Sequence, residues 1–153
     1  MKLLIDTNVL LRLRDPESPH HSDCVQALDQ LRKFSKTAYT CAQVLVEYWV
    51  VATRPREVNG LALSTDAVDR YLSDTETVFS CLPEPSDIAA RWRKLVVEHG
   101  VQGRPAYDAR LVALMQAHDV THVVTLNTGD FARYRGITPV LPSEAATMAT
   151  PEE

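Results

Sequence analysis

Apolar residues recur along the chain in two patterns, short continuous runs and longer segments with helical spacing. The short runs predict buried strands at residues 2–5, 37–41, 78–82 and 121–126, and the run at 137–141 fits a last strand or a loop. The helical pattern predicts helices at 21–34, 42–53, 64–75, 86–99 and 106–119, with a short helical piece within 127–136. Because strands alternate with helices, the sequence predicts an α/β fold with a mostly parallel sheet.

Length and composition set the expected domain boundaries. A chain of 153 residues that is 45% hydrophobic can close one hydrophobic core, and it contains no internal repeat. Residues 1–142 are therefore expected to form a single domain. Residues 143–153, "SEAATMATPEE", are expected to be a polar, flexible tail.

The sequence also predicts a cytoplasmic protein. No apolar run approaches the ~20 residues that a membrane span needs. The N-terminal "MKLLIDTN" is interrupted by an aspartate too early for a secretory signal. The three cysteines stand far apart without a CxxC pair, so disulfides and a zinc site are not expected and a reducing compartment suits them.

Three polar residues interrupt the stretch "LLIDTNVLL" where the first strand should end. Asp6, Thr7 and Asn8 are all common at helix N-termini, so a capping role accounts for them by itself. In parallel α/β sheets, however, ligands bind outside the carboxyl ends of the strands. The stretch is therefore a candidate site as well as a candidate helix start.

Three further acids occupy comparable places. Asp108 falls in the first turn of a predicted helix, where it would also favour the helix dipole, and Asp130 follows a predicted strand in an ordinary turn sequence. Glu47 is different, because it is the only charge within 42–53 and has apolar neighbours on every helical face. Burying an isolated carboxylate is costly unless it is paired or bound to metal. A functional role is therefore favoured for Glu47, with an ion pair to an arginine as the alternative.

Together, Asp6, Glu47, Asp108 and Asp130 indicate metal-dependent chemistry. Carboxylates that converge repel one another unless a cation neutralises them. Hard oxygen ligands suit Mg²⁺ or Mn²⁺. Such an ion can activate water, hold a phosphodiester in line and stabilise the leaving oxygen. The implied reaction is hydrolysis of a phosphodiester.

Four segments resemble, in order and at the usual intervals, the signature blocks of PIN domains. They are "IDTNVLL", "QVLVEYWVVATRP" with "NGLALS" behind it, "YDARLVALMQAHDV" and "VVTLNTGDF", and the likeness covers nearly the whole chain. It is closest to VapC-type toxin ribonucleases of bacterial toxin–antitoxin pairs. The resemblance implies a single PIN-like (Rossmann-like) domain with a mostly parallel sheet of four or five strands. It also implies a Mg²⁺- or Mn²⁺-dependent endoribonuclease.

By this resemblance, Asp6, Glu47 and Asp108 would be metal-binding carboxylates. Many relatives carry an acid where this chain has Asn127 and another three residues later. This chain keeps only the second, so Asp130 is predicted to be the fourth acid. Asn127 would be a neutral oxygen ligand or an orienting group, which leaves open whether one or two ions bind.

Other polar side chains are candidates for orienting the site or holding RNA. Thr7 and Asn8 are expected to orient the neighbouring carboxylate or to contact phosphate, beside any capping role. Arg54 ends the second block, and Arg104 and Arg110 flank the acid of the third. A guanidinium binds phosphate through two hydrogen bonds, although an arginine at a helix C-terminus also favours the dipole.

The remaining basic and histidine residues carry less information. The run "RWRK" at 91–94 is interpreted as a solvated helix face with one buried ring. The five histidines show no arrangement for acid–base cleavage through the ribose 2′-hydroxyl. Water activated by metal is therefore favoured, and the products would carry a 5′-phosphate and a 3′-hydroxyl.

Two other protein classes also begin with a strand that ends in an aspartate, and both are excluded. Haloacid-dehalogenase phosphatases need a second acid where Asn8 stands, and receiver-like domains need a late lysine, of which there is none after Lys94. A non-catalytic PIN-like binding module is the alternative that stays open. It would show no divalent-ion binding that Asp6→Asn abolishes.

Partners are implied by the resemblance as well. They are an RNA substrate, a second copy in a homodimer, and a small antitoxin laid over the acidic cleft, where one of its arginines could replace the charge of the metal. The net charge of −4 gives no general attraction for nucleic acid. Local basic groups or metal ions must therefore hold the RNA.

Overall fold

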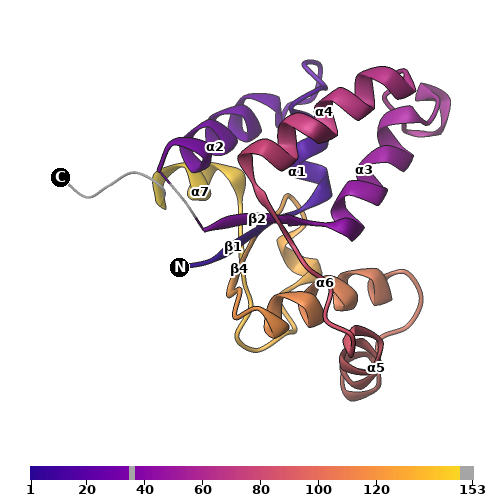
Figure 1. Cartoon of the computed structure of the whole chain (residues 1–153), viewed down its shortest axis with the longest axis vertical. Helices are drawn as coiled ribbons and strands as arrows, with labels where there is room; N and C mark the ends of the chain where they lie inside the picture. Colours follow the sequence, from indigo (N-terminus) through magenta and orange to yellow (C-terminus); the bar gives the residue numbers. More distant parts are fainter. Residues whose placement is uncertain (35–36, 149–153) are drawn as a thin grey trace.

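Five short parallel strands form the centre of the fold (Figure 1). The structure is a computed structural model and describes residues 1–34 and 37–148. The strands are β1 (Leu3–Ile5), β2 (Ala38–Cys41), β3 (Ser80–Leu82), β4 (His122–Val124) and β5 (Thr138–Val140). They lie in the order β3-β2-β1-β4-β5, and every neighbouring pair is parallel. The predicted α/β class is confirmed, and the segment left open between strand and loop forms β5.

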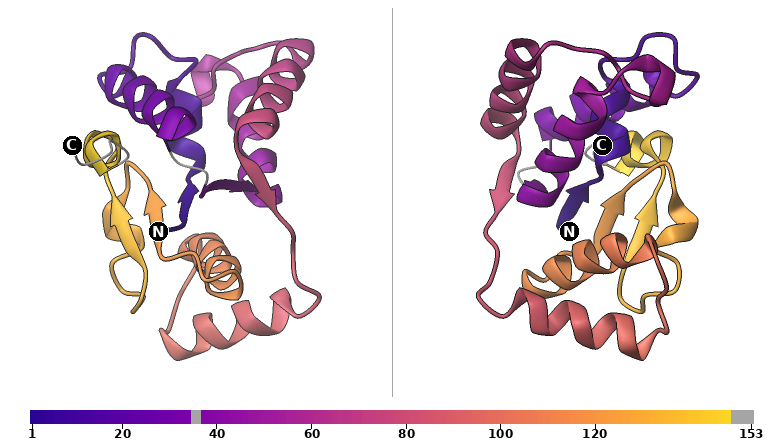
Figure 2. Two further views of the ribbon diagram at one scale, coloured as in Figure 1. Left: turned by 60° about the vertical axis from the view of Figure 1, so that its left-hand side comes forward. Right: turned by 90° about the vertical axis from the view of Figure 1, so that its right-hand side faces the viewer.

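Helices cover both faces of this sheet. They are α1 (Thr7–Arg12), α2 (His21–Phe34), α3 (Ala42–Thr53), α4 (Thr65–Val78), α5 (Ile88–Glu98), α6 (Pro105–Ala117) and α7 (Pro142–Met148), with two short 3₁₀ helices, η1 (Arg56–Val58) and η2 (Thr128–Asp130). The paired helices α5 and α6 lie on one side, and α1, α2, α4 and α7 lie on the other (Figures 1 and 2). Among the described helices, none has the length and apolar character to cross a bilayer.

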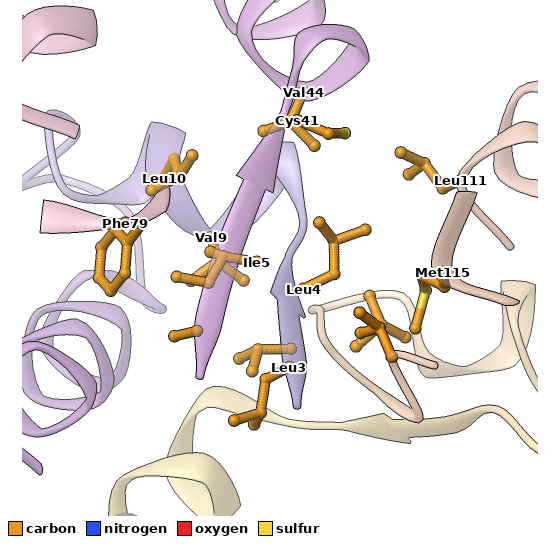
Figure 3. Close-up of a cluster of buried hydrophobic side chains, with 14 of the residues drawn as sticks. Leu3, Leu4, Ile5, Val9, Leu10, Cys41, Val44, Phe79, Leu111 and Met115 are labelled. Atoms are coloured by element: carbon orange, nitrogen blue, oxygen red, sulfur yellow. The ribbon is translucent and has the colours of Figure 1, made fainter. Parts of the chain in front are cut away.

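The core extends over both faces of β1, which explains why the strands are continuous apolar runs. Leu3, Leu4 and Ile5 are all buried. Leu4 points toward Leu111 and Met115 of α6, and Ile5 points to the opposite face (Figure 3). A parallel sheet with both faces covered has no room for alternating polar residues. On β1, polar side chains therefore begin only where the strand ends, at Asp6.

The expectation of a flexible tail from residue 143 is wrong for residues 143–148. They belong to α7, which packs against α2 and buries two alanines. Pro142 occupies the first helical position, and the Glu144 carboxylate accepts a hydrogen bond at 3.0 Å from the backbone N–H of the residue before the helix. The polar composition of residues 143–153 predicts a flexible tail in spite of these helix-start signals. Residues 149–153 of the expected tail lie outside the described residues.

Candidate active site

The polar residues that follow β1 and β4 line one cavity at the carboxyl end of the sheet, together with side chains of α3 and α6. We call it the acidic cavity; its volume is about 750 Å³. All four predicted acids line it, although they come from four separate segments of the chain. Eight of the nine predicted site residues are brought together there: Asp6, Thr7, Asn8, Glu47, Arg54, Asp108, Asn127 and Asp130.

Asp6 caps α1 and is held by three hydrogen bonds. Its carboxylate accepts from the Thr7 backbone N–H at 2.8 Å, from the Thr125 hydroxyl at 2.8 Å and from Asn8 Nδ2 at 3.3 Å. Asp6 is only 7% exposed. The capping role and the position in the cavity, which the sequence left as alternatives, therefore occur together.

Asn8 joins the ends of the two central strands. Its side-chain oxygen accepts a hydrogen bond from the Leu126 N–H at 3.1 Å, just beyond β4, and its Nδ2 lies 3.3 Å from the Thr125 hydroxyl oxygen. That hydroxyl also accepts from the Asn127 N–H at 3.1 Å. The polar residues after β1 and after β4 thus form one connected network around the Asp6 carboxylate.

Glu47 reaches the same cavity from α3 and is half-buried, as its apolar neighbours predict. Both of its carboxylate oxygens accept hydrogen bonds. The Thr7 hydroxyl donates to Oε2 at 2.9 Å, and Gln43 Nε2, one turn earlier on α3, donates to Oε1 at 2.9 Å. Glu47 is therefore fixed in orientation by hydrogen bonds, and it forms no ion pair with an arginine in the part of the chain that the structure describes.

Gln43 is itself oriented by α6 and by the segment after β3. Its side-chain oxygen accepts from Arg110 Nη1 at 2.8 Å, and its Nε2 also donates to the Tyr107 carbonyl at 2.9 Å. Since an arginine can only donate, the amide can be placed in one way only, with its nitrogen toward Glu47. Arg110 also forms an ion pair with Glu84. Arg110, predicted to contact substrate, is the one site residue that lies outside the cavity lining.

Asp108 and Asp130 complete the set of acids from the opposite elements. Asp108 lies in the first turn of α6, and Asp130 lies in η2, three residues after Asn127. Within the described part of the chain, neither carboxylate accepts a hydrogen bond or forms an ion pair. These two acids thus line the cavity without the fixed partners that hold Asp6 and Glu47.

Burial and the charges of neighbouring acids raise the pKa of two of the four acids, Asp6 and Asp108. Burial raises the pKa of Asp6, hydrogen bonds oppose this, and the charges of Glu47 and Asp130 add to it. Burial also raises the pKa of Asp108 to about 7, reinforced by the charges of Asp130, Asp6 and Glu47 and opposed by Arg133. The cavity therefore carries more negative charge than its own cations balance.

The cavity fits a divalent cation in donor chemistry, although not as a ready-made cage. No three His, Cys, Asp or Glu residues of the described segments are grouped closely enough to hold one ion as they stand. Mg²⁺, however, is usually bound by one or two carboxylates and keeps several waters. The oxygen donors present suit such an ion, as do the burial and, second to it, the repulsion that raise the pKa values of Asp6 and Asp108.

Two arginines also line the acidic cavity. Arg54 Nη2 donates to the Asn59 carbonyl at 3.1 Å, while its Nε is buried without a hydrogen-bond partner among the described residues. Gly60 packs closely against the Arg54 backbone, and no side chain fits at position 60, because a Cβ there would stand 1.8 Å from the Arg54 carbonyl oxygen. Arg104, at the start of α6, is the second arginine of the lining.

Two residues of the network, Gln43 and Thr125, were not predicted from the sequence. Gln43 precedes Glu47 by four residues on one helix, a spacing that places side chains side by side. Thr125 is completely buried and ends the "HVVT" run, the same position relative to β4 that Asp6 has relative to β1. Both signals are visible in the sequence, but each is also common in ordinary packing.

Comparison with known proteins gives a consistent assignment. Residues 3–137 match the family model described as PIN domain. No curated protein matches the sequence.

Solved structures with a similar fold include VapBC2 from Rickettsia felis bound to a DNA fragment from their promoter (16% identity, TM-score 0.64, covering 92% of this chain and 98% of that one). PAE2754 from Pyrobaculum aerophilum is similar at 20% identity and TM-score 0.59, covering 92% and 91%. FitAcB from Neisseria gonorrhoeae is similar at 21% identity and TM-score 0.52, covering 92% and 97%. At these identities the likeness concerns the fold.

Proposed function

This chain belongs to the PIN-domain family, and from that premise we propose that it is a Mg²⁺- or Mn²⁺-dependent endoribonuclease, the toxin of a toxin–antitoxin pair. The observation that carries the proposal is the convergence of Asp6, Glu47, Asp108 and Asp130 on one cavity. Their mutual repulsion makes the cavity a favourable place for a divalent cation. A bound ion would neutralise these charges and activate the water that attacks the phosphodiester.

The side chains around the cavity have distinct proposed roles. Asp6 and Glu47 would hold the ion from positions fixed by hydrogen bonds, and Asp108 and Asp130 would complete the charge. Asn127 would supply a neutral oxygen or an orienting contact. Arg54 would hold a phosphate of the RNA at the rim, because it lines the cavity and a guanidinium can donate two hydrogen bonds to a phosphate.

The proposed protein partner is a small antitoxin that covers the acidic cavity. Toxin–antitoxin complexes occur among the similar folds, VapBC2 and FitAcB. Exposed apolar side chains, Val46 and Val50 of α3, border the acids, and Val46 is 63% exposed. An antitoxin arginine could neutralise the carboxylates in place of the ion. A homodimer remains part of the proposal.

The direct test is incubation of the purified protein with total RNA and Mg²⁺ or Mn²⁺, followed by mapping of the cut ends. Cleavage should leave 5′-phosphate and 3′-hydroxyl ends, stop with EDTA and be absent in Asp6→Asn. Cleavage that persists in EDTA, or ends that carry a 2′,3′-cyclic phosphate, would contradict the proposed chemistry.

One finding favours a second candidate function, a PIN-like module that binds without cleaving. The acids are not preformed as a metal cage in the described residues. Titration calorimetry with Mn²⁺ distinguishes the two candidates. The nuclease should bind Mn²⁺ in a manner that Asp6→Asn abolishes, whereas the binding module should release the same small heat in both proteins.

A further inference from the structure

A second pocket adjoins the acidic cavity, between α5 and α6. Its volume is about 750 Å³, within the range of ~300–1,000 Å³ typical of small-ligand sites. Ile88, Trp92 and Ala106 contribute to its walls. Arg104 and Tyr107 line both this pocket and the acidic cavity, so the two hollows meet at these side chains. We call this space the α5/α6 pocket.

Two aromatic rings line the α5/α6 pocket. Trp92 is fixed in place, since its Nε1 donates a hydrogen bond at 2.8 Å to the Ala106 carbonyl. Tyr107 is 64% exposed, while its backbone carbonyl is held by Gln43. The first turn of α6 is thus fixed, but the tyrosine ring is left facing solvent. Aromatic rings presented in this way offer flat surfaces on which nucleobases stack.

Arg104 supplies a positive charge where the two hollows meet. Over residues 1–34 and 37–148, its side chain makes no hydrogen bond or ion pair. Arg110, the other cation of the α5/α6 pocket, is already engaged by Gln43 and Glu84. Arg104 is therefore the cation with donors available for an incoming anion.

We propose that the α5/α6 pocket binds one unpaired nucleobase of the RNA, with Arg104 holding the phosphate that links it to the phosphodiester in the acidic cavity. The proposal rests on the ribonuclease function above and identifies the pocket that selects the cleavage position. A nucleotide matches the lining, because it brings a flat ring for the aromatic walls and an anion for Arg104. An apolar segment of a protein partner would cover Arg104 without pairing its charge.

Tryptophan fluorescence tests this directly, because the chain has only two tryptophans and Trp49→Phe leaves Trp92 as the sole emitter. The Trp49→Phe protein is titrated in EDTA, which prevents cleavage, with a short single-stranded RNA. In a matched series of RNAs, each RNA lacks the base at one nucleotide but keeps the ribose and phosphate there, and this abasic position differs from one RNA to the next. The intact RNA should quench Trp92. At one position, the abasic site should remove the quenching and weaken binding about fivefold or more.

Two variants assign the contacts. Tyr107→Ala should weaken binding of the intact RNA by a similar factor and leave the abasic RNA unaffected, since the contact with the base is already absent. Arg104→Ala should weaken both RNAs, because it removes a phosphate contact. Arg91→Ala is the matched control, as this arginine of α5 pairs with Asp87 and does not line the pocket. It should bind both RNAs like the parent protein.

Parallel cleavage assays with Mn²⁺ keep this proposal separate from the ribonuclease proposal. If the protein cuts an RNA that neither quenches Trp92 nor responds to the abasic site, the base subsite is wrong and the nuclease stands. If the base dependence appears without cleavage, the subsite stands and the nuclease fails. A Tyr107→Ala protein that binds RNA normally but changes its elution volume in gel filtration would overturn the subsite and assign the pocket to a second copy of the chain.

Discussion

Asp6 and Glu47 are held by hydrogen bonds on every carboxylate oxygen, whereas Asp108 and Asp130 accept none within the described residues. The first pair comes from the ends of β1 and from α3, the second from α6 and η2. The difference indicates a cavity with one preorganised half, Asp6 and Glu47, and one unpartnered half, Asp108 and Asp130, of which Asp108 has a raised pKa. Such an arrangement would let an ion enter against fixed ligands while the other acids supply attraction.

The largest expected effect comes from removing a charge in the unpartnered half. Asp108→Asn keeps the size of the side chain but removes attraction for the ion, which would stabilise the negative charge that develops in the reaction. Cleavage of RNA with Mn²⁺ should fall by about a hundredfold or more. Expression of the wild-type chain alone should inhibit growth, and Asp108→Asn should relieve the inhibition. Undiminished toxicity of the variant would remove Asp108 from the site.

The preorganised half is tested through Gln43, which touches Glu47 but does not line the acidic cavity. Gln43→Ala frees one oxygen of Glu47 and leaves Arg110 with Glu84 as its remaining partner. The affinity for Mn²⁺, measured by calorimetry, should fall about tenfold, the lower end of what the loss of such supporting hydrogen bonds costs. Gln116→Ala, an exposed position on α6, is the matched control. Equal affinities in both variants would mean that the orientation of Glu47 does not matter.

Some features of the fold and of the acidic cavity can be predicted from the sequence, and others cannot. The bounds of α2 and α3 agree with the predicted helices, because their apolar spacing reflects faces that are buried in the structure. Asp6 and Asp130 were expected in one site because ligands bind outside the carboxyl ends of parallel strands. The roles of all four acids in catalysis stay predictions. Gln43 and Thr125 could not be assigned, because their contacts cross between elements whose packing a single sequence does not give. The helix α7 was missed because the polar composition of residues 143–153 favours a flexible tail.

The pH dependence of ion binding follows from Asp108 in the unpartnered half. Since the pKa of Asp108 is raised to about 7, a proton must leave this carboxyl before it can help to hold a cation. The apparent affinity for Mn²⁺ should therefore fall about tenfold between pH 8 and pH 6. Calorimetry at both pH values measures this change. In Asp108→Asn the dependence should be clearly weaker, and an equally steep dependence there would place the responsible proton on another group.

The smallest effect, a change in thermal stability, distinguishes the two halves by its sign. The pKa of Asp108 is higher in the folded protein than in the unfolded chain, so ionisation disfavours folding above pH 7 and this cost disappears as the pH falls toward 4. Without divalent ions at pH 8, Asp108→Asn should raise Tm by roughly 2–4 °C. Thr125→Val removes a hydroxyl that donates to Asp6 and should lower Tm by a similar amount. The increase in Tm of Asp108→Asn should be smaller at pH 5 than at pH 8. If Tm changes in the same direction in both variants at pH 8, the two halves do not differ in the way described.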